Sequence, residues 1–492
     1  MKLARFASVH HRVPFMKITC RHVTLAAAAA FAAIITACGG SSGVPGAGSG
    51  PPWTWVSGGN TGGASGNYGT LGASAASNVP GAREAPVTWT DSSGNLWLFG
   101  GLGYDSAGTG GYLNDLWKYT PGTGWIWVSG SDKADAIGVY GTQGKPLGTT
   151  VPGGRESAVS WIDASGELWL FGGVGFDSVG TAVGSLNDLW KFSPATGQWT
   201  WVSGSATVAT ATNAIGVYGT KGVAAATNTP GARESATAWI DAKGNLWLFG
   251  GLAYDSTGNQ AAINDLWEYT PSTGQWTWVS GSNTGGAIGV YGNQDTAAAG
   301  NAPGARTAPI AWTDASGNLW MFGGYGLDST GSSQGYLNDL WKFEPGTGWA
   351  WIGGSPTSNA LGVYGTQGTG ASGNGPGARA AAVASIDSSG NLWLFGGEGL
   401  DATGTLGVGY LNDLWEFTPS SGTWTWVSGS ATVNAAGAYG TQGTGAVSNV
   451  PGGRYSAAVW TDSSGTMWLF GGNGLDVNDN YGDLNDLWKV TP

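Results

Sequence analysis

The sequence repeats one pattern six times between residues 53 and 492, and this repetition restricts the chain to a repeat architecture. Three markers recur in a fixed order: a Pro-Gly-(Ala/Gly)-Arg motif, a Gly-Gly doublet and an Asn-Asp-Leu-Trp motif. Successive arginines of the first marker are 72 to 78 residues apart. These arginines are Arg83, Arg155, Arg233, Arg306, Arg379 and Arg454. A repeat of this kind replaces the domain count that length alone would suggest.

Each copy has the pattern of four short strands. In the first copy, strands are expected at 83–90, 96–99, 116–119 and 125–128. The turn 91–95 supplies the Asp and Gly that a tight hairpin needs. The second strand is apolar without interruption, which predicts burial on both of its faces. The fold class is therefore all-β, with four antiparallel strands in each copy.

The order of these motifs resembles the kelch family of β-propellers. The second strand ends in Gly-Gly, Asn-Asp-Leu-Trp-Lys-Tyr follows, and a Thr-Gly turn leads to a tryptophan that opens the fourth strand. The resemblance implies a six-bladed propeller over residues 53–492. Kelch units have about 50 residues, so each copy here has an insertion between its fourth strand and the next arginine. A Tyr-Gly pair marks the insertions, at Tyr68, Tyr140, Tyr218, Tyr291, Tyr364 and Tyr439.

The two ends of the repeat region predict how the ring closes. The last copy ends after its third strand at Pro492, whereas Trp53–Gly58 reads as a fourth strand with no blade of its own. An open ring would leave unpaired sheet edges. We therefore expect the N-terminal strand to complete the sixth blade.

The N-terminal segment has the pattern of a secretory leader. A basic stretch precedes the apolar run 25–35, which is too short to span a membrane. The residues before Cys38 resemble the lipobox of bacterial lipoproteins, which implies a signal peptide at 1–37 and lipidation of Cys38. Residues 38–52 are rich in Gly, Ser and Pro and are predicted to be a tether. An outer-membrane lipoprotein is expected, with an ordinary secreted protein as the alternative, and either Met1 or Met16 is the start.

Charge and residue types exclude several function classes. Lys and Arg number 19 against 31 Asp and Glu, a net charge of −12, which disfavours nucleic-acid binding. The histidines are His10, His11 and His22, all within the predicted leader, and no cysteine follows Cys38. Histidine- and thiol-based catalysis and histidine metal sites are thus excluded from the predicted mature chain. Galactose oxidase contains a similar propeller, but its copper site needs two histidines and a cysteine-tyrosine crosslink, so no cofactor is predicted.

The loops from strand two to strand three and from strand four to the next copy are expected to share one face of the ring, together with the six arginines. Loops on a rigid scaffold commonly carry binding residues. Two interpretations of the arginines remain open. They form a ring of bidentate sites for acidic ligands, or each pairs with an aspartate of its own or the adjacent blade and fixes a glycine-rich loop.

Residues that break the sixfold pattern are further candidates. Glu84, Glu156 and Glu234 follow the arginine in the first three copies, and Thr307, Ala380 and Tyr455 replace them in the others. One side of the channel mouth is therefore expected to be more acidic. Ser385 stands where the other copies have tryptophan, which indicates either a pocket or a variation in packing.

The oxygen-rich segment after Asp476 is a weak calcium candidate through Asp476, Asn478 and Asn480. Its glycine falls one position late for an EF-hand, and a solvated turn is the alternative.

The sequence favours a monomeric, lipid-anchored envelope propeller that binds a protein or glycan without catalysis. One alternative is a sugar-active enzyme that uses carboxylate or arginine groups, similar to the kelch-type sialic acid mutarotases. The other is a purely structural component of the envelope.

Overall fold

The computed structural model describes residues 50–491 with the exception of residues 211 and 315. The predicted signal peptide, Cys38 and the tether up to residue 49 lie outside the described residues. All regular elements of the described part are strands. That part contains no helix long and apolar enough to cross a membrane.

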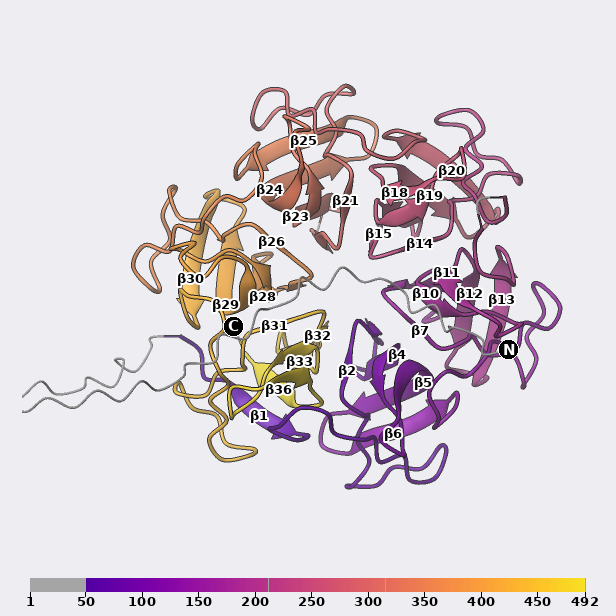
Figure 1. Cartoon of the computed structure of the whole chain (residues 1–492), viewed down its shortest axis with the longest axis horizontal. Helices are drawn as coiled ribbons and strands as arrows, with labels where there is room; N and C mark the ends of the chain where they lie inside the picture. Colours follow the sequence, from indigo (N-terminus) through magenta and orange to yellow (C-terminus); the bar gives the residue numbers. More distant parts are fainter. Residues whose placement is uncertain (1–49, 211, 315, 492) are drawn as a thin grey trace, which may run out of the picture. The chain divides into compact units, whose positions relative to one another are not determined.

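Six four-stranded antiparallel arrays stand around a central axis, which makes residues 50–491 a six-bladed β-propeller (Figure 1). In the first blade, β3 (Val87–Thr90), β4 (Leu96–Tyr104), β5 (Gly110–Thr120) and β6 (Gly124–Ser129) follow one another from the axis outward. Short turns such as Asp91–Asn95 join neighbouring strands. Asp91 accepts hydrogen bonds from the backbone N–H groups of Ser93 and Asn95, at 3.0 and 2.9 Å. The hairpin predicted there is confirmed.

The other blades repeat this order. The second has β8 (Val159–Ile162), β9 (Leu168–Phe171), β12 (Leu189–Ser193) and β13 (Gln198–Ser203); the third has β15 (Thr237–Ile240), β16 (Leu246–Phe249), β19 (Leu266–Thr270) and β20 (Gln275–Ser280). The fourth has β22 (Ile310–Thr313), β23 (Leu319–Leu327), β24 (Gln334–Glu344) and β25 (Gly348–Gly353); the fifth has β27 (Val383–Ile386), β28 (Leu392–Gly399), β29 (Gly409–Thr418) and β30 (Thr423–Ser428). The sixth has β32 (Ala458–Thr461), β33 (Met467–Phe470), β36 (Leu487–Val490) and β1 (Thr54–Ser57).

The sixth blade closes the ring as predicted. Strand β1 pairs antiparallel with β36, with Trp55 opposite Trp488. Trp53 is 1% exposed and packs against Phe395 of the fifth blade at a ring distance of 5.3 Å. The two ends of the propeller are thus joined within one sheet.

A two-residue strand at the arginine of each copy adds a second, smaller pairing on the loop face. These strands are β2 (Arg83–Glu84), β7 (Arg155–Glu156), β14 (Arg233–Glu234), β21 (Arg306–Thr307), β26 (Arg379–Ala380) and β31 (Arg454–Tyr455). Each pairs with the chain beyond Gly-Gly, as Glu84 pairs with Leu102. In blades two, three and six that chain forms separate strands: β10 (Val174–Phe176), β11 (Val183–Ser185), β17 (Leu252–Tyr254), β18 (Gln260–Ala262), β34 (Asn473–Leu475) and β35 (Tyr481–Asp483).

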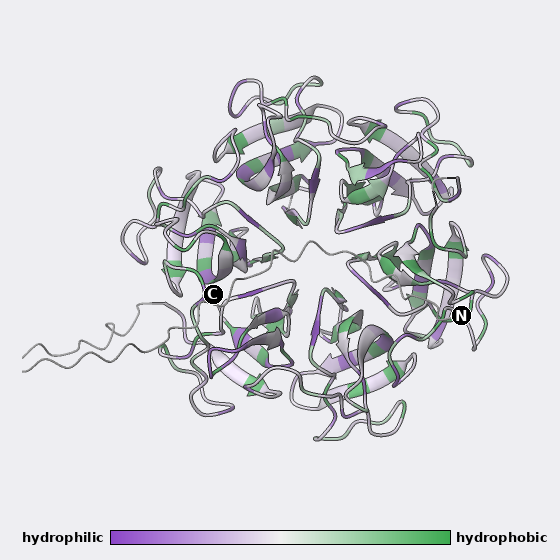
Figure 2. Ribbon diagram, viewed as in Figure 1, coloured by the Kyte–Doolittle hydropathy of each residue, from purple (hydrophilic) through white to green (hydrophobic). Residues whose placement is uncertain are grey.

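Aromatic side chains pack between neighbouring blades, and hydrophobic stretches recur on the strands of every blade (Figure 2). Phe99 of the first blade meets Trp199 of the second at 5.2 Å. Trp89 donates a hydrogen bond from Nε1 to the carbonyl of Trp169 across the same seam, at 3.2 Å. In the fifth blade, Ser385 instead meets the Thr461 hydroxyl at 2.5 Å. Ser385 is 6% exposed, so the missing indole is a variation in packing that a hydroxyl pair accommodates.

The insertions do not crowd the loop face as expected, because each lies along the outermost strand of a blade. The Gly72 N–H donates to the carbonyl of Trp127 at 2.8 Å, and equivalent bonds recur at the other five blades. The Tyr68 ring stands edge-on to Trp127 at 5.2 Å. The insertion therefore covers the outer sheet edge, which would otherwise expose unpaired backbone groups.

Candidate functional site

The six arginines are internal parts of the blades. Arg83 donates two hydrogen bonds to Asp115, from Nη1 to Oδ1 at 2.7 Å and from Nη2 to Oδ2 at 2.8 Å. It also donates to the carbonyls of Gly81 and Gly100. Arg83 and Asp115 are both 0% exposed. Burial acts to lower the pKa of Arg83, but the Asp115 carboxylate outweighs it and raises the pKa.

Two more side chains complete this buried unit. The Tyr68 hydroxyl and the Trp117 indole N–H both donate to Asp115 Oδ2, at 2.6 and 2.7 Å. Tyr68 belongs to the insertion and Trp117 to Asn-Asp-Leu-Trp, so one carboxylate holds three markers of the repeat together. The remaining ion pairs are Arg155–Asp188, Arg233–Asp265, Arg306–Asp339, Arg379–Asp413 and Arg454–Asp486.

These contacts decide between the two interpretations of the arginines. Each guanidinium is at most 1% exposed and is bonded to an aspartate of its own blade. A ligand cannot reach these groups without opening the blade. The ligand-binding hypothesis for the arginine ring is therefore wrong, and the structural interpretation holds.

The aspartates of the loops between strands two and three are also structural. Asp476 accepts hydrogen bonds at Oδ1 from the backbone N–H groups of Asn478 and Asn480, at 2.8 and 2.9 Å. Although burial acts to raise the pKa of Asp476, the N–H groups of Asn480 and Asn478 lower it. Asp105 binds its own loop in the same way. The described residues hold no group of three or more His, Cys, Asp or Glu placed to bind a metal ion. The calcium candidate therefore has a single carboxylate, and one oxygen of that carboxylate accepts hydrogen bonds from its own loop.

Polar side chains that break the symmetry gather where the short strands meet the channel. Glu84 pairs with Leu102, and Leu102 pairs with Tyr112, so these three positions of a blade share one face. We call the polar residues at these positions the mouth. Its acids are Glu84, Glu156, Glu234, Glu398 and Asp483, its tyrosines are Tyr112, Tyr325, Tyr336, Tyr410 and Tyr455, and its other polar residues are Ser185, Thr307 and Asn473.

Hydrogen bonds between blades connect one part of the mouth. The Tyr455 hydroxyl of the sixth blade interacts with the Glu84 carboxyl of the first as a hydrogen-bond partner. The Tyr336 hydroxyl of the fourth blade does the same with Glu398 of the fifth. Between them, the Tyr410 ring lies 5.0 Å from that of Tyr455. Burial raises the pKa of all these phenols, that of Tyr410 to about 12, so the hydroxyls remain protonated donors at neutral pH.

Glu156 is the most buried acid of the mouth. It is 7% exposed, and its carboxyl takes no part in a hydrogen bond with any described residue. Burial raises its pKa to about 8, with added repulsion from Glu84, Glu234 and Asp483. Burial also raises the pKa of Glu234 to about 7. At neutral pH these carboxyls therefore exist in both protonation states.

The acids of the mouth come from both halves of the ring. Glu84, Glu156 and Glu234 do lie near one another at the channel, as their common position predicted. Glu398 and Asp483 add acids from the fifth and sixth blades, and burial raises the pKa of both. Blades one to three contribute three of these acids, and blades five and six contribute two.

A closed ring of backbone hydrogen bonds lies directly beneath the mouth. The residue two positions after each arginine has a φ between 48° and 55°. Its N–H donates to the carbonyl of the equivalent residue in the preceding blade. The six bonds measure 2.7 to 3.0 Å. We call these residues the collar: Ala85, Ser157, Ser235, Ala308, Ala381 and Ser456. The collar separates the mouth from the channel segment lined by β3 and its equivalents.

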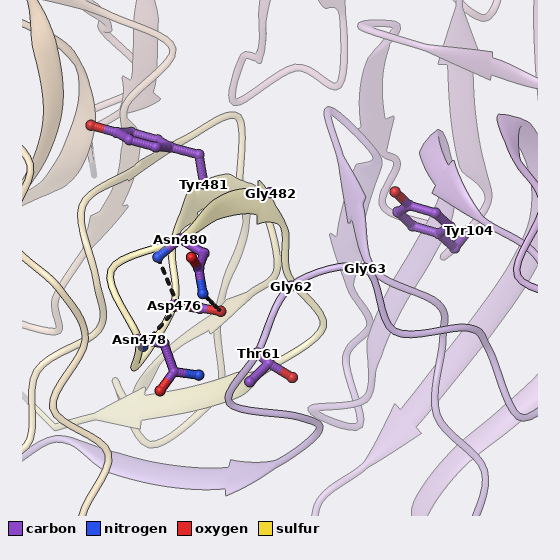
Figure 3. Close-up of a pocket in the computed structure, with 9 residues that line it drawn as sticks. All are labelled: Thr61, Gly62, Gly63, Tyr104, Asp476, Asn478, Asn480, Tyr481 and Gly482. Carbon is purple, nitrogen blue, oxygen red and sulfur yellow. Dashed lines mark hydrogen bonds between the residues drawn. The ribbon is translucent and has the colours of Figure 1, made fainter. Parts of the chain in front are cut away.

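Two cavities lie near the mouth and the collar. One of about 390 Å³ lies at the seam between the sixth and first blades (Figure 3). Asn478 and Thr61 lie on one side of it and Tyr104 on the other, while the Tyr481 ring points away from them (Figure 3). Tyr481 lies 5.3 Å from Tyr410, so this cavity adjoins the mouth. The second, of about 270 Å³, is lined by inner-strand residues such as Thr88 and Ile162 on the other side of the collar.

Most of the mouth was missed at the sequence level. Sequence reasoning compared the six copies only at the position that follows the arginine. The residue directly after Gly-Gly varies in the same way and includes Glu398, and the residue before Leu-Asn-Asp includes Tyr112 and Asp483. A comparison of every repeat position would have found them.

Comparisons with known proteins agree on the fold alone. No protein-family model matches the sequence. No curated protein matches it either. Among solved structures 407 chains match, one of them described as "Structure of YjhT", with 16% identity and a TM-score of 0.47 over 84% of this chain and 94% of that one. So widely shared an architecture does not identify a ligand.

Proposed function

We propose that this protein is an exported, lipid-anchored propeller of the cell envelope that binds an organic ligand at its mouth without converting it. Glu156 carries the proposal, because this nine-tenths buried residue presents a carboxyl that no described residue binds, which leaves its oxygens for a ligand. Its position also fits a ligand site. Three other acids, from three further blades, act on the same carboxyl.

The chemistry of the mouth limits the class of ligand. Carboxyls and phenols accept and donate hydrogen bonds to hydroxyl and amine groups. The arginines that would bind an anion are buried in ion pairs. The ligand is therefore a neutral or cationic glycan or a protein segment rich in such groups, and acidic saccharides are disfavoured.

The envelope location rests on the leader and on Cys38. A lipid on Cys38 anchors the propeller to a membrane surface through the segment of Gly, Ser and Pro residues that follows it. Fractionation of cells that express the protein or its Cys38→Ser variant tests this. The wild-type chain is expected in the membrane fraction and the variant in the soluble fraction; equal solubility of both overturns the anchor.

A thermal-shift screen tests ligand binding. The panel contains neutral, amino and acidic saccharides and cell-wall fragments. A ligand present at about 100 times its Kd stabilises the fold by about 2.7 kcal/mol. We expect shifts with neutral or amino saccharides that are lost in Glu156→Gln and kept in Glu416→Gln, an acid on β29 outside the mouth. Shifts with acidic saccharides alone contradict the proposed site.

A sugar-active enzyme is the second candidate, because Glu156 and Glu234 have pKa values of about 8 and 7. One acid and one base that titrate near neutral pH are what proton transfer at an anomeric centre requires. Polarimetry of freshly dissolved neutral reducing sugars tests this. Acceleration that Glu156→Gln and Glu234→Gln abolish would establish catalysis. A protein that leaves the rate at background at all pH values would have the binding role only. If the thermal-shift screen also shows no ligand, a structural role in the envelope is favoured.

A further inference from the structure

The charges at the mouth are unbalanced. Glu156 on β7 faces Glu84 on β2, Glu234 on β14 and Asp483 on β35, and the charged groups that act on it are all acids. Burial raises the pKa of Tyr112 on β5, and the nearby Glu156 and Glu234 carboxyls raise it further. Folding has therefore gathered acids from four blades without a matching cation.

Most cations of the described residues are engaged elsewhere. The six arginines are in buried ion pairs. Five lysines lie over tryptophan rings of other parts of the blades: Lys118, Lys191, Lys221, Lys342 and Lys489. Lys133 binds Ser106 and Asp132. Lys145 lies in an insertion at the outer strand of the second blade, and Lys243 lies in the turn between β15 and β16. Among the described residues, no Lys or Arg therefore balances the acids of the mouth.

We infer that the ligand of the mouth carries an organic ammonium group, which Glu156 and the acids around it bind. This inference rests on the proposed function, because it names the chemistry of the ligand at that same site. Carboxylates and aromatic faces together are the groups that attract an organic cation.

Two features favour an organic cation over a metal ion. Within the described residues, the acids are not grouped closely enough to hold a metal. Aromatic rings stand beside two of the acids, Glu84 and Glu398. Tyr410 lies 5.0 Å from Tyr455 and 5.3 Å from Tyr481, the latter at an interplanar angle of 81°. Rings set at such angles present π faces in more than one direction, which suits a bulky ammonium group.

Bound cations also relieve the repulsion among the acids. A cation at the mouth stabilises the Glu156 carboxylate over the protonated acid, so binding near neutral pH releases a proton. This release is a signature that a purely hydrogen-bonded neutral ligand does not share.

Choline and 3,3-dimethyl-1-butanol test the inference, because they have the same shape and only choline is charged. Calorimetry at pH 7.5 in two buffers of different protonation enthalpy measures both affinity and proton release. We expect choline to bind about tenfold or more tightly than the alcohol, as a close charge pair predicts. We expect about half a proton or more to leave per choline bound, since Glu156 is mostly protonated at that pH.

The variants separate this site from the rest of the protein. Glu156→Gln is expected to lose the proton release and most of the choline affinity, and Glu416→Gln to keep both. A melting curve of each variant shows that it is folded. Equal binding of choline and the alcohol, or choline binding unchanged in Glu156→Gln, overturns the inference.

A saccharide pair distinguishes failure of the inference from failure of the proposed function. Glucosamine trisaccharide carries ammonium groups, and N-acetylglucosamine trisaccharide is its neutral match. Binding of the neutral sugar at least as tightly as the charged one supports the proposed function and overturns the ammonium inference. Binding of choline but of neither sugar supports the ammonium site and overturns a glycan ligand. Absence of binding with all four probes overturns both.

Discussion

Ala85 donates its backbone N–H to the carbonyl of Ser456 at 2.8 Å, which joins the first blade to the last at the channel. The pairing of β1 with β36 joins the same two ends of the chain at the outer side of the sixth blade. The ring is therefore closed twice, once by a sheet and once by the collar. Both closures satisfy backbone groups that an open ring would leave unpaired.

Deletion of Trp53–Gly59 tests the outer closure. The deletion exposes the edge of β36 and removes Trp53, which is 1% exposed. Loss of one buried tryptophan alone costs about 3–5 kcal/mol, so we expect a larger fall in the free energy of unfolding, measured by urea denaturation with tryptophan fluorescence. Removal of the chain up to residue 52 is the control and should have a small effect. An unchanged unfolding midpoint after the longer deletion contradicts the assignment of β1.

Replacement of Arg306 by Met tests the structural role of the arginines. The change leaves Asp339, which is 0% exposed, without its bidentate partner. An uncompensated buried charge costs about 3–5 kcal/mol of stability. We expect that loss in urea denaturation, with ligand binding at the mouth intact.

The double variant Arg306→Met with Asp339→Leu serves as the control. It removes both charges and should recover part of the loss, though not all, because Tyr291 and Trp341 also donate to Asp339. Equal instability of the single and double variants would show that the ion pair is not the cause.

Sequence reasoning succeeded where a local pattern decides the structure. Alternating apolar residues, Asp-Gly turns and six copies of one motif predict strands, hairpins and a ring, and the unpaired strand at Trp53 predicts its closure. It left two interpretations open where a distant partner decides. The Pro-Gly-Ala-Arg motif does not indicate whether its guanidinium points into the blade or toward solvent. Asp115, which forms the ion pair with Arg83, lies 32 residues further along the chain.

The collar is a second feature that the sequence does not show. A left-handed backbone usually selects Gly or Asn, whereas the collar positions hold only Ala and Ser. Their conformation is imposed by hydrogen bonds between blades, which no single copy of the repeat contains. The mouth was found in part, since Glu84, Glu156 and Glu234 share one repeat position, but Glu398 and Asp483 needed the strand register.

Replacement of Ala381 by Gly tests the strain in the collar. Ala381 has a φ of 52°, where a Cβ atom costs about 1–2 kcal/mol. Gly removes that cost and adds entropy to the unfolded chain, so we expect a gain of up to about 1 kcal/mol in urea denaturation. Ala384→Gly in β27 is the matched control and should lose about 0.5–1 kcal/mol. A greater loss at Ala381 than at Ala384 would mean that the collar is not strained.

The pH dependence of stability tests the environment of Glu156. Burial and neighbouring acids raise its pKa in the folded protein to about 8, from an ordinary value of 4.5. Below pH 4.5 the residue is protonated in both the folded and the unfolded state and contributes no difference. Between pH 4.5 and 8 the unfolded chain ionises while the folded protein keeps its proton, so this residue lowers stability as the pH rises.

Gln cannot ionise, and Glu156→Gln should therefore escape this loss. Its free energy of unfolding is expected to match that of the wild type near pH 4.5 and to exceed it by about 2–4 kcal/mol at pH 8 and above. Urea denaturation at a series of pH values measures the difference. Glu344→Gln, at an acid that pairs with Lys342 at 2.8 Å outside the mouth, is the control and should show no such trend. If the difference in free energy of unfolding between Glu156→Gln and the wild type is the same at pH 5 and pH 8, Glu156 is already ionised in the folded protein. Its main distinction from the other acids of the mouth would then be lost.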